Sequence, residues 1–150
     1  MKQRPQTPAS DPTAEYRLED QVGYWLRRAY QRHMAIFATV MADLDLTSIQ
    51  FSSLVKLRDM KAVTQTELGR LIGIDKATIS GVVSRLEKRG LLQFRLDPLD
   101  RRSRIIALTA VGETLLSQAL QRIEQVGEDT LAPINDAERA ALRETLRKLA

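Results

Sequence analysis

The chain has 150 residues, of which 43% are hydrophobic and 28% charged, as expected of one globular domain. It has no cysteine and one histidine, which excludes disulfides and thiol-based redox sensing, so neither a metal site nor a cofactor is expected. The net charge of +4 favours an anionic partner only weakly, and no apolar run is long enough for a membrane span or signal peptide, so a cytoplasmic protein is expected.

The N-terminal part of the chain is predicted to be a disordered arm followed by one long helix. Residues 1–12 hold three of the five prolines among polar residues, which is typical of disorder. From about Thr13 to Asp43, apolar residues recur at spacings of three and four, which predicts a long amphipathic helix. Its apolar stripe comprises Leu18, Val22, Leu26, Ala29, His33, Ile36 and Val40. Helices of this length usually pack against a partner chain.

Capping signals then predict the beginnings of two shorter helices. Thr47 and Gln50 have the spacing of a capping box, and the helix that they begin is expected to end near Met60. Thr64 and Glu67 repeat the pattern, which predicts a second capping box at the start of a short helix.

A tight turn and a further helix follow. Gly73 is expected to end the preceding helix, Asp75 to cap the next one, and Gly90 to end that helix after Arg89. Its apolar face comprises Ile79, Val82, Val83 and Leu86. Two short helices joined in this way predict a helix-turn-helix.

After this helix the apolar pattern becomes that of strands. Leu91–Leu96 and Arg104–Leu108 flank a charged tip, which predicts a two-stranded hairpin. The predicted fold class is therefore mainly α with a small β-hairpin wing: a winged helix-turn-helix with long N- and C-terminal helices.

Two helices are predicted after the hairpin. Thr109 caps the first, and Pro133 separates it from the second, which begins with a capping box at Asn135 and Glu138. The apolar stripe of the first is Val111, Leu115, Ala119, Ile123 and Val126, and that of the second is Leu142, Leu146 and Leu149.

The charge pattern and the polar face of the helix after Asp75 predict DNA binding. Nine basic and five acidic residues lie between Ala62 and Leu108, so this segment carries the whole charge excess of the chain. Small and polar residues opposite the apolar face would let the helix enter a major groove about 12 Å wide. These candidates are Lys76, Ala77, Thr78, Ser80, Gly81, Ser84 and Arg85. The alternative is an ordinary solvated helix face.

The hairpin tip adds three candidates, Asp100, Arg101 and Arg102. An acid two residues before an arginine can orient the guanidinium through a charge-assisted pair, and an arginine so held fits a narrow minor groove. The alternative is a solvated charge cluster, because exposed strands often use charge to block aggregation.

The sequence resembles the MarR family (multiple-antibiotic-resistance regulators). The resemblance rests on Thr66–Leu68, Asp75–Ser80, Leu86–Leu92, Asp97–Arg102, and Leu108 and Thr109 followed by Gly112. It implies a homodimer with a helical dimerisation domain (residues 13–45 and 109–150) and a winged DNA-binding domain (46–108). Each winged domain would bind half of a pseudo-palindromic operator, with Asp100 orienting Arg102 in the minor groove. Many members are repressors that a small ligand releases from DNA.

The resemblance implies a ligand pocket lined by the first, second and fifth helices. The first helix is rich in aromatic and basic side chains, which suit a small aromatic carboxylate or its coenzyme A thioester. The candidate effector residues are Trp25, Arg28, Arg32, His33 and Phe51. The alternatives are that His33 is a hydrogen-bonded structural residue and that the arginines form surface or interface salt bridges.

Two other classes of protein are to be weighed. An enzyme is not expected, because the sequence lacks a Gly-rich phosphate loop and a nucleophile elbow, and we identify no catalytic residue. The second class is a winged helix that contacts protein, or binds DNA without sequence preference or effector. Salt-dependent binding to any DNA, with no preferred site, would identify the latter.

Overall fold

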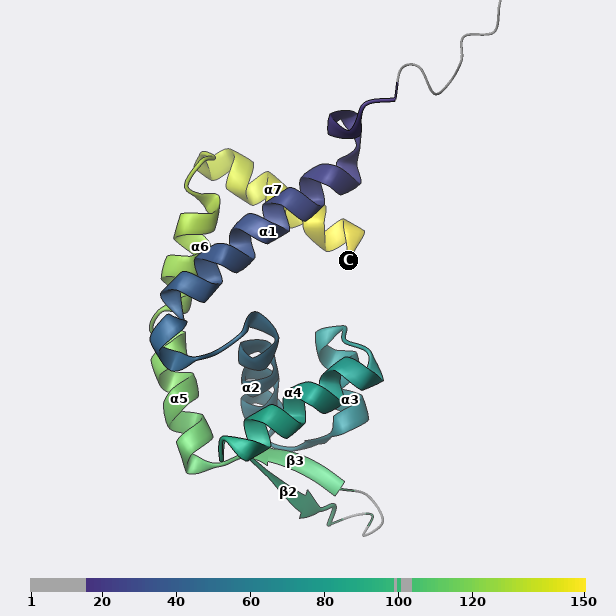
Figure 1. Ribbon diagram of the computed structural model, residues 1–150, viewed down its shortest axis with the longest axis vertical. Helices are drawn as coiled ribbons and strands as arrows, with labels where there is room; N and C mark the ends of the chain where they lie inside the picture. Colours follow the sequence, from purple (N-terminus) through teal and green to yellow (C-terminus); the bar gives the residue numbers. More distant parts are fainter. Residues whose placement is uncertain (1–15, 99, 101–103) are drawn as a thin grey trace, which may run out of the picture. The chain divides into compact units, whose positions relative to one another are not determined.

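The computed structural model describes residues 16–98, 100 and 104–150 (Figure 1), and these residues fall into two compact units that divide between Arg32 and His33. In the first unit a short 3-10 turn, η1 (Leu18–Asp20), precedes α1 (Val22–Val40), which continues into the second unit. The predicted disordered arm, residues 1–12, lies outside the described residues.

The helix prediction from Thr13 is wrong for the described residues before Val22. Arg17 and Gln21 have extended backbone angles, so α1 begins only after Gln21. The indole N–H of Trp25 donates a hydrogen bond to the Glu19 carbonyl oxygen at 2.6 Å, which ties the 3-10 turn to the first turns of the helix.

The second unit continues through a second 3-10 turn, six further helices and three strands among the described residues. In chain order these are η2 (Ala42–Leu44), α2 (Ser48–Met60), β1 (Val63–Thr64), α3 (Gln65–Ile72), α4 (Lys76–Lys88), β2 (Leu92–Leu96), β3 (Arg104–Leu108), α5 (Ala110–Leu120), α6 (Ile123–Leu131) and α7 (Asp136–Leu149). None of the described helices is long and apolar enough to cross a membrane.

Local capping determines where most of these helices begin. Thr47 and Gln50 form the expected reciprocal capping box at the start of α2. At α3 only half of the predicted box forms: the Thr64 hydroxyl accepts from the Glu67 N–H, but the Glu67 carboxylate binds Arg70 at 2.6 Å instead. An arginine one turn away is a stronger partner for a carboxylate than the neutral backbone N–H.

The winged domain is built around the contact between α3 and α4 (Figure 1). Gly73 ends α3 in the left-handed conformation, with φ 70°, and so permits the tight turn. A side chain on Gly69 would begin 3.0 Å from the carbonyl oxygen of Ile74, so a glycine lets the turn pack closely onto α3. Leu68 and Leu86 are fully buried in the resulting core.

The sheet has three strands in the order β1-β3-β2, one more than the predicted hairpin. Val63 and Thr64 pair with Ile106 and Ile105 of β3 in antiparallel register. A strand of two residues carries no periodic pattern, so the hydrophobic alternation that identified β2 and β3 could not reveal it.

The wing joins α5 through a close backbone contact. The Leu91 carbonyl oxygen accepts from the Thr109 N–H at 3.0 Å, and the Thr109 hydroxyl donates to the Gly90 carbonyl oxygen at 2.6 Å. A Cβ on Gly112 would lie 2.2 Å from the Leu91 carbonyl oxygen, so only glycine fits there. This contact explains why Thr109 and Gly112 occur together after β3.

The prediction of one continuous helix from Thr109 to Pro133 is wrong. α5 ends at Leu120 and α6 begins at Ile123, with Gln121 and Arg122 between them. The predicted stripe was also misplaced at its start: Val111 is 62% exposed, whereas Leu116 is fully buried. Packing of α5 against Leu91 through Gly112 turns a different face toward the core.

Candidate nucleic-acid interface

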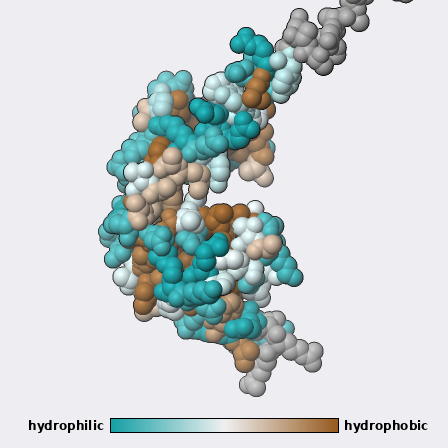
Figure 2. Space-filling model, viewed as in Figure 1, coloured by the Kyte–Doolittle hydropathy of each residue, from teal (hydrophilic) through white to brown (hydrophobic). Residues whose placement is uncertain are grey.

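α4 separates an apolar face from a small, polar one as the sequence predicts. Ile79, Val82, Val83 and Leu86 are all buried. The opposite face is exposed except at Gly81, which is half-buried, and Figure 2 shows mainly hydrophilic and neutral surface over this helix. The exposed groove candidates are Lys76, Ala77, Thr78, Ser80, Ser84 and Arg85. The helix can therefore enter a groove without exposing its core side.

The first turn of α4 is fixed by Asp75. One carboxylate oxygen accepts from the Thr78 N–H at 2.9 Å and the other from the Thr78 hydroxyl at 2.6 Å. The hydrogen bond from that hydroxyl is the main reason why the pKa of Asp75 is lowered from 3.8, the backbone N–H of Thr78 being second. The Thr78 hydroxyl thus donates within the helix and has only its oxygen lone pairs left for DNA.

Arg85 and Gly81 form a pair that the sequence did not reveal. A Cβ built on Gly81 would lie 3.5 Å from Nη1 of Arg85, so the guanidinium lies back along α4 over the glycine. The spacing of four residues puts them on one face of the helix. Because residue 81 is a glycine, the Arg85 guanidinium can lie against the surface of the helix at this position.

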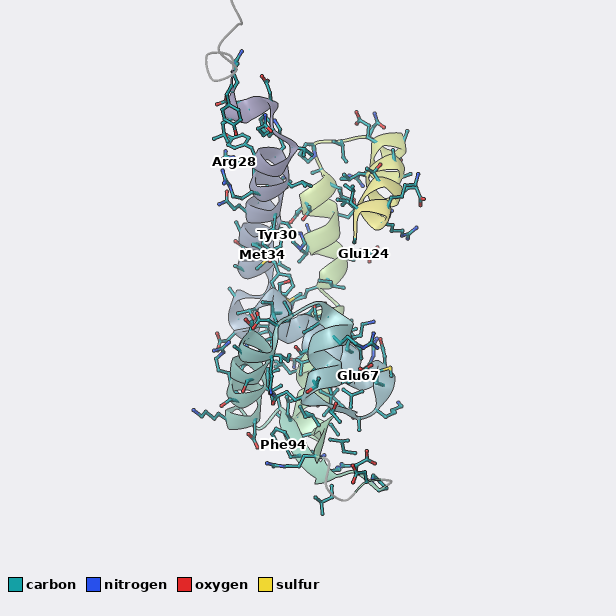
Figure 3. The ribbon with its side chains drawn as sticks, turned by 90° about the vertical axis from the view of Figure 1, so that its right-hand side faces the viewer. Arg28, Tyr30, Met34, Glu67, Phe94 and Glu124 are labelled. Carbon is teal, nitrogen blue, oxygen red and sulfur yellow. The ribbon has the colours of Figure 1, made fainter. Side chains whose placement is uncertain are left out.

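The wing is described only in part. Asp100 is exposed, and the other two wing candidates, Arg101 and Arg102, lie outside the described residues. Where β3 begins after the tip, the Arg104 guanidinium lies 4.3 Å from the ring centroid of Phe94, which is labelled on β2 in Figure 3. A cation–π contact of this kind orients a basic group beside the tip. The register explains it, since Leu96 faces Arg104 and Phe94 is two residues away on the same side of the sheet.

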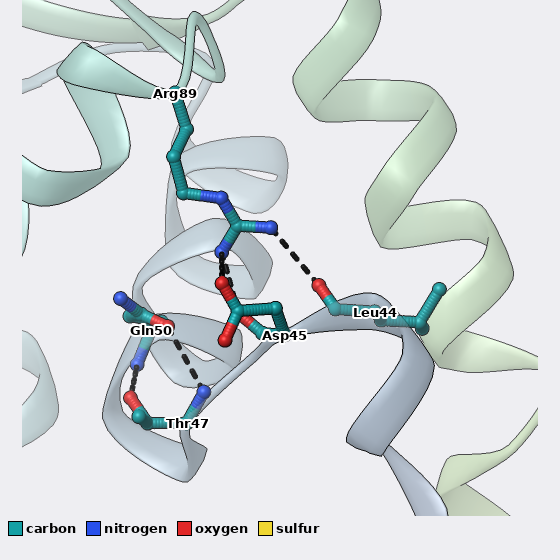
Figure 4. Close-up of polar contacts among 5 residues, drawn as sticks. All are labelled: Leu44, Asp45, Thr47, Gln50 and Arg89. Carbon is teal, nitrogen blue, oxygen red and sulfur yellow. Dashed lines mark hydrogen bonds and ion pairs between the residues drawn. The ribbon is translucent and has the colours of Figure 1, made fainter.

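Sequence reasoning also missed the contacts of Arg89, which lies at the C-terminal end of α4. Arg89 donates to the carbonyl oxygens of Leu44 at 2.9 Å and Asp45 at 2.5 Å (Figure 4). Beside it is a hollow of about 350 Å³ whose walls include Gln50 and Lys88. The acceptors are main-chain atoms 44 and 45 residues earlier, so no sequence motif signals the contact.

The candidate effector residues belong to both units. In the first, Trp25 is 56% exposed and Arg28, labelled in Figure 3, and Arg32 are also exposed. In the second, His33 is half-buried with Nδ1 3.0 Å from the Thr130 hydroxyl. Phe51 packs against Phe37, with ring centroids 5.9 Å apart.

Phe51 also lines a hollow of about 300 Å³ between α2 and α3, together with Val55 and Leu71. His33 faces α6 through Thr130, so each of these two side chains has a structural partner. The assembly of the five candidates into one pocket stays a prediction. Among the described residues no three histidine or acidic side chains gather where a metal ion could bind.

The buried core of α3 and α4, the three-stranded wing and the exposed polar face of α4 define a winged helix-turn-helix protein. Residues 46–103 match the MarR family. The transcriptional repressor NicR of Pseudomonas putida is 43% identical over 145 residues, which cover 95% of this chain and 92% of NicR. The chain therefore belongs to the MarR family of winged-helix transcription regulators.

Two solved structures resemble the chain along most of its length. BpsR of Bordetella bronchiseptica, whose DNA binding is regulated by 6-hydroxynicotinic acid, is 42% identical with a TM-score of 0.85, and the match covers 89% of this chain and 96% of BpsR. The transcriptional repressor CouR bound to a 23-mer DNA duplex is 33% identical with a TM-score of 0.81, and the match covers 88% of this chain and 94% of CouR.

Proposed function

We propose that the chain is a homodimeric, sequence-specific DNA-binding repressor, and that a small aromatic carboxylate or its coenzyme A thioester releases it from its operator. The observation that carries the proposal is the exposed face of α4, where small and polar residues lie opposite a buried apolar face. A helix of this kind, held rigidly by its N-cap and core, can bring hydroxyl and guanidinium groups to base edges.

The wing would supply the second part of the interface. Asp100 and Arg102 have the spacing of an acid that orients an arginine, and Arg104 adds a basic group that Phe94 already orients. An arginine in the minor groove next to the site of α4 would read groove width rather than base identity. The similar repressor CouR has been solved bound to a 23-mer DNA duplex, which supports double-stranded DNA as the partner.

The homodimer is supported by apolar side chains that the single chain leaves exposed. Val22 and Leu26 of α1 are 72% and 45% exposed, and Leu142 and Leu146 of α7 are 39% and 42% exposed. Leucines at helical spacing on an otherwise charged helix are typical of a helix that packs against another chain. A dimer would also present two copies of α4 to the two halves of a pseudo-palindromic operator.

The effector class is supported by relatives and by the chemistry of α1. The DNA binding of BpsR is regulated by 6-hydroxynicotinic acid, which is an aromatic carboxylate. The basic and aromatic side chains of Arg28, Arg32 and Trp25 can pair with a carboxylate and stack on a ring. Such a ligand shifts DNA affinity only by as much as it prefers the conformation that fits the operator poorly.

The DNA part of the proposal is tested by selecting duplexes from a randomised pool with the purified protein. We expect one pseudo-palindromic sequence to be enriched, and Arg102→Ala to weaken binding to it by about tenfold or more while the melting temperature is unchanged. Arg58→Ala, which removes an arginine paired with Asp59 on α2, is the control. Equal, salt-dependent binding to every duplex would instead support DNA binding without sequence preference.

The effector part is tested by adding 6-hydroxynicotinic acid, benzoic acid or benzoyl coenzyme A to the complex with the selected duplex and following fluorescence anisotropy. We expect at least one of them to release the protein, and Arg32→Ala and His33→Ala to weaken that release. If both variants respond like the wild-type protein, the pocket on α1 is wrong.

A further inference from the structure

The turn between α1 and α2, residues 42–45, is held by arginines from two distant elements. Arg122, between α5 and α6, forms an ion pair and hydrogen bond with Asp43. From the other side, Arg89 at the end of α4 donates to the carbonyl oxygens of Leu44 and Asp45 (Figure 4). The turn thus connects the break between α5 and α6 with the end of the DNA-reading helix.

The conformation of this turn is unusual and firmly anchored. Asp45 has φ 48° and ψ 48°, a left-handed conformation that residues other than glycine seldom adopt. Leu44 and Leu46, on either side of it, are both buried, with exposed fractions of 7% and 5%. The carbonyl oxygens that Arg89 binds are therefore fixed in direction by the buried side chains beside them.

Arg89 is suited to position the end of α4. It is the C-cap residue of that helix, and its Nη1 and Nη2 atoms reach two successive carbonyl oxygens at once. A planar guanidinium can make this forked contact, whereas a lysine ammonium carries the same charge on a flexible stem and makes a single, less directional contact. The Nη1 atom also lies 3.9 Å from a carboxylate oxygen of Asp45.

The opposite side of the turn leads toward α6. The hydrogen bond from Arg122 holds the pKa of Asp43 below its ordinary value, so the pair is charged at neutral pH. Farther along α6, the Thr130 hydroxyl lies 3.0 Å from Nδ1 of His33, one of the candidate effector residues. Contacts therefore run from α6 through Arg122, Asp43 and the turn to Arg89 at the end of α4.

We propose that residues 42–45 form the joint that couples α5 and α6 to α4, and that Arg89 is the positioning residue that sets the pose of α4 for the operator. This inference rests on the proposed function in one respect: it assigns Arg89 to specific DNA binding. The mechanical coupling itself stands on the contacts of Asp43, Leu44 and Asp45 alone.

The coupling is tested by hydrogen exchange in the free, full-length protein. We expect Arg122→Gln and Asp43→Asn, neither of which touches α4, to speed exchange at the amides that close α4 by about threefold or more. These amides are Arg89, Gly90 and Leu91, which donate to Arg85, Glu87 and Leu86. Arg58→Lys is the control and should leave them unchanged. Unchanged exchange in both test variants overturns the joint.

The positioning role is tested with the selected duplex and a scrambled duplex of the same length. We expect Arg89→Lys to lower the ratio of the two affinities by about tenfold, with Arg58→Lys at the wild-type ratio. Arg89→Lys and Arg122→Gln should also be non-additive in a double-mutant cycle, although their side chains bind different residues. A lower melting temperature with an unchanged ratio means that Arg89 is merely structural and overturns the positioning role.

The two tests separate failure of this inference from failure of the proposed function. If the wild-type protein prefers no duplex, the proposed function fails, and hydrogen exchange alone decides whether the joint exists. If Arg89→Lys does not fold, the ratio of affinities for the selected and scrambled duplexes is measured for Arg122→Gln and Asp43→Asn instead. An unchanged ratio in both variants again overturns the role of the joint in DNA binding.

Discussion

The segment predicted as the winged domain (residues 46–108) and the outer helix α7 differ in how far they bury their apolar residues. In the winged domain Leu54, Leu68 and Leu86 are completely buried within the single chain. In α7 the leucines stay exposed, and Leu149 reaches 68%. Residues 46–108 therefore bury their large apolar side chains in a core that they share with Phe37 of α1 and Leu116 of α5, while α7 carries apolar surface that a second chain would cover.

The two regions therefore differ in how they gain stability from burying leucines. A fully buried leucine stabilises a fold by about 1.5–3 kcal/mol relative to an exposed one, so the winged domain has already gained this energy. Helix α7 would gain it only on association, which ties its stability to protein concentration. Five variants test this comparison, and they are ordered by expected effect.

The largest effect is expected from a charge on the exposed face of α4. Ser84→Glu places a carboxylate against the phosphates and base edges of the groove, and we expect it to weaken binding to the selected duplex by about 1000-fold, without loss of folding. Fluorescence anisotropy measures the affinity. Ser117→Glu, an equal change at an exposed serine of α5, is the control, and similar losses in both would contradict the groove assignment.

The second largest effect is expected from changes in the outer helix α7. Leu142→Lys combined with Leu146→Lys should raise the dimer dissociation constant by about 100-fold or more, because two leucines would no longer be buried on association. Sedimentation velocity over a range of concentrations gives this constant. Leu96→Lys changes a leucine of the wing that is 62% exposed, and it should leave the dimer intact. A dimer that tolerates both changes in α7 must use another surface.

A third change acts on the junction between the regions. Gly112→Ala forces a methyl group against the Leu91 carbonyl oxygen, and we expect it to lower the free energy of unfolding by about 1–3 kcal/mol. Gly127→Ala is the matched control, because a side chain there meets nothing within 4 Å and alanine favours a helix. Urea unfolding measures both variants, which should move in opposite directions.

The smallest effects concern two helix caps, one in each region. Asn135→Ala in α7 should lower the free energy of unfolding by about 1 kcal/mol at any pH where the protein folds. Asp75→Ala should also destabilise, but in a way that depends on pH. Because the pKa of Asp75 is lowered in the folded protein from 3.8, its contribution is present above that value and is lost as the pH falls through the lowered pKa.

Urea unfolding at about pH 7 and about pH 3 separates the two caps. The difference between wild type and Asp75→Ala should shrink in acid, whereas the effect of Asn135→Ala should persist. A pH-independent difference for Asp75→Ala would mean that its carboxylate is not the capping group.

The features that the sequence predicts correctly are those set by neighbours along the chain. Thr47, Asp75 and Asn135 each accept from an N–H three residues ahead, so the residue types and their spacing were enough. The burial of Leu86 also followed from helical periodicity.

The features that the sequence did not predict depend on contacts between distant segments. The break at Arg122 interrupts a stripe that continues through Ile123 and Val126, so periodicity alone favoured one helix. Arg89 binds main-chain oxygens, which any residue provides, and β1 is defined only by its partner β3. The candidate site on α4 was predictable, but the contacts that fix both of its ends were predictable only at Asp75.

Thr64 has two structural roles, because it pairs with Ile105 in the sheet and also caps α3. Thr64 therefore links the sheet of the wing directly to the helix-turn-helix. If α4 and the wing contact DNA as proposed, the distance between their two contacts is set by the protein rather than by the DNA. We therefore expect an operator to vary in sequence at each of the two places but to keep the number of base pairs between them.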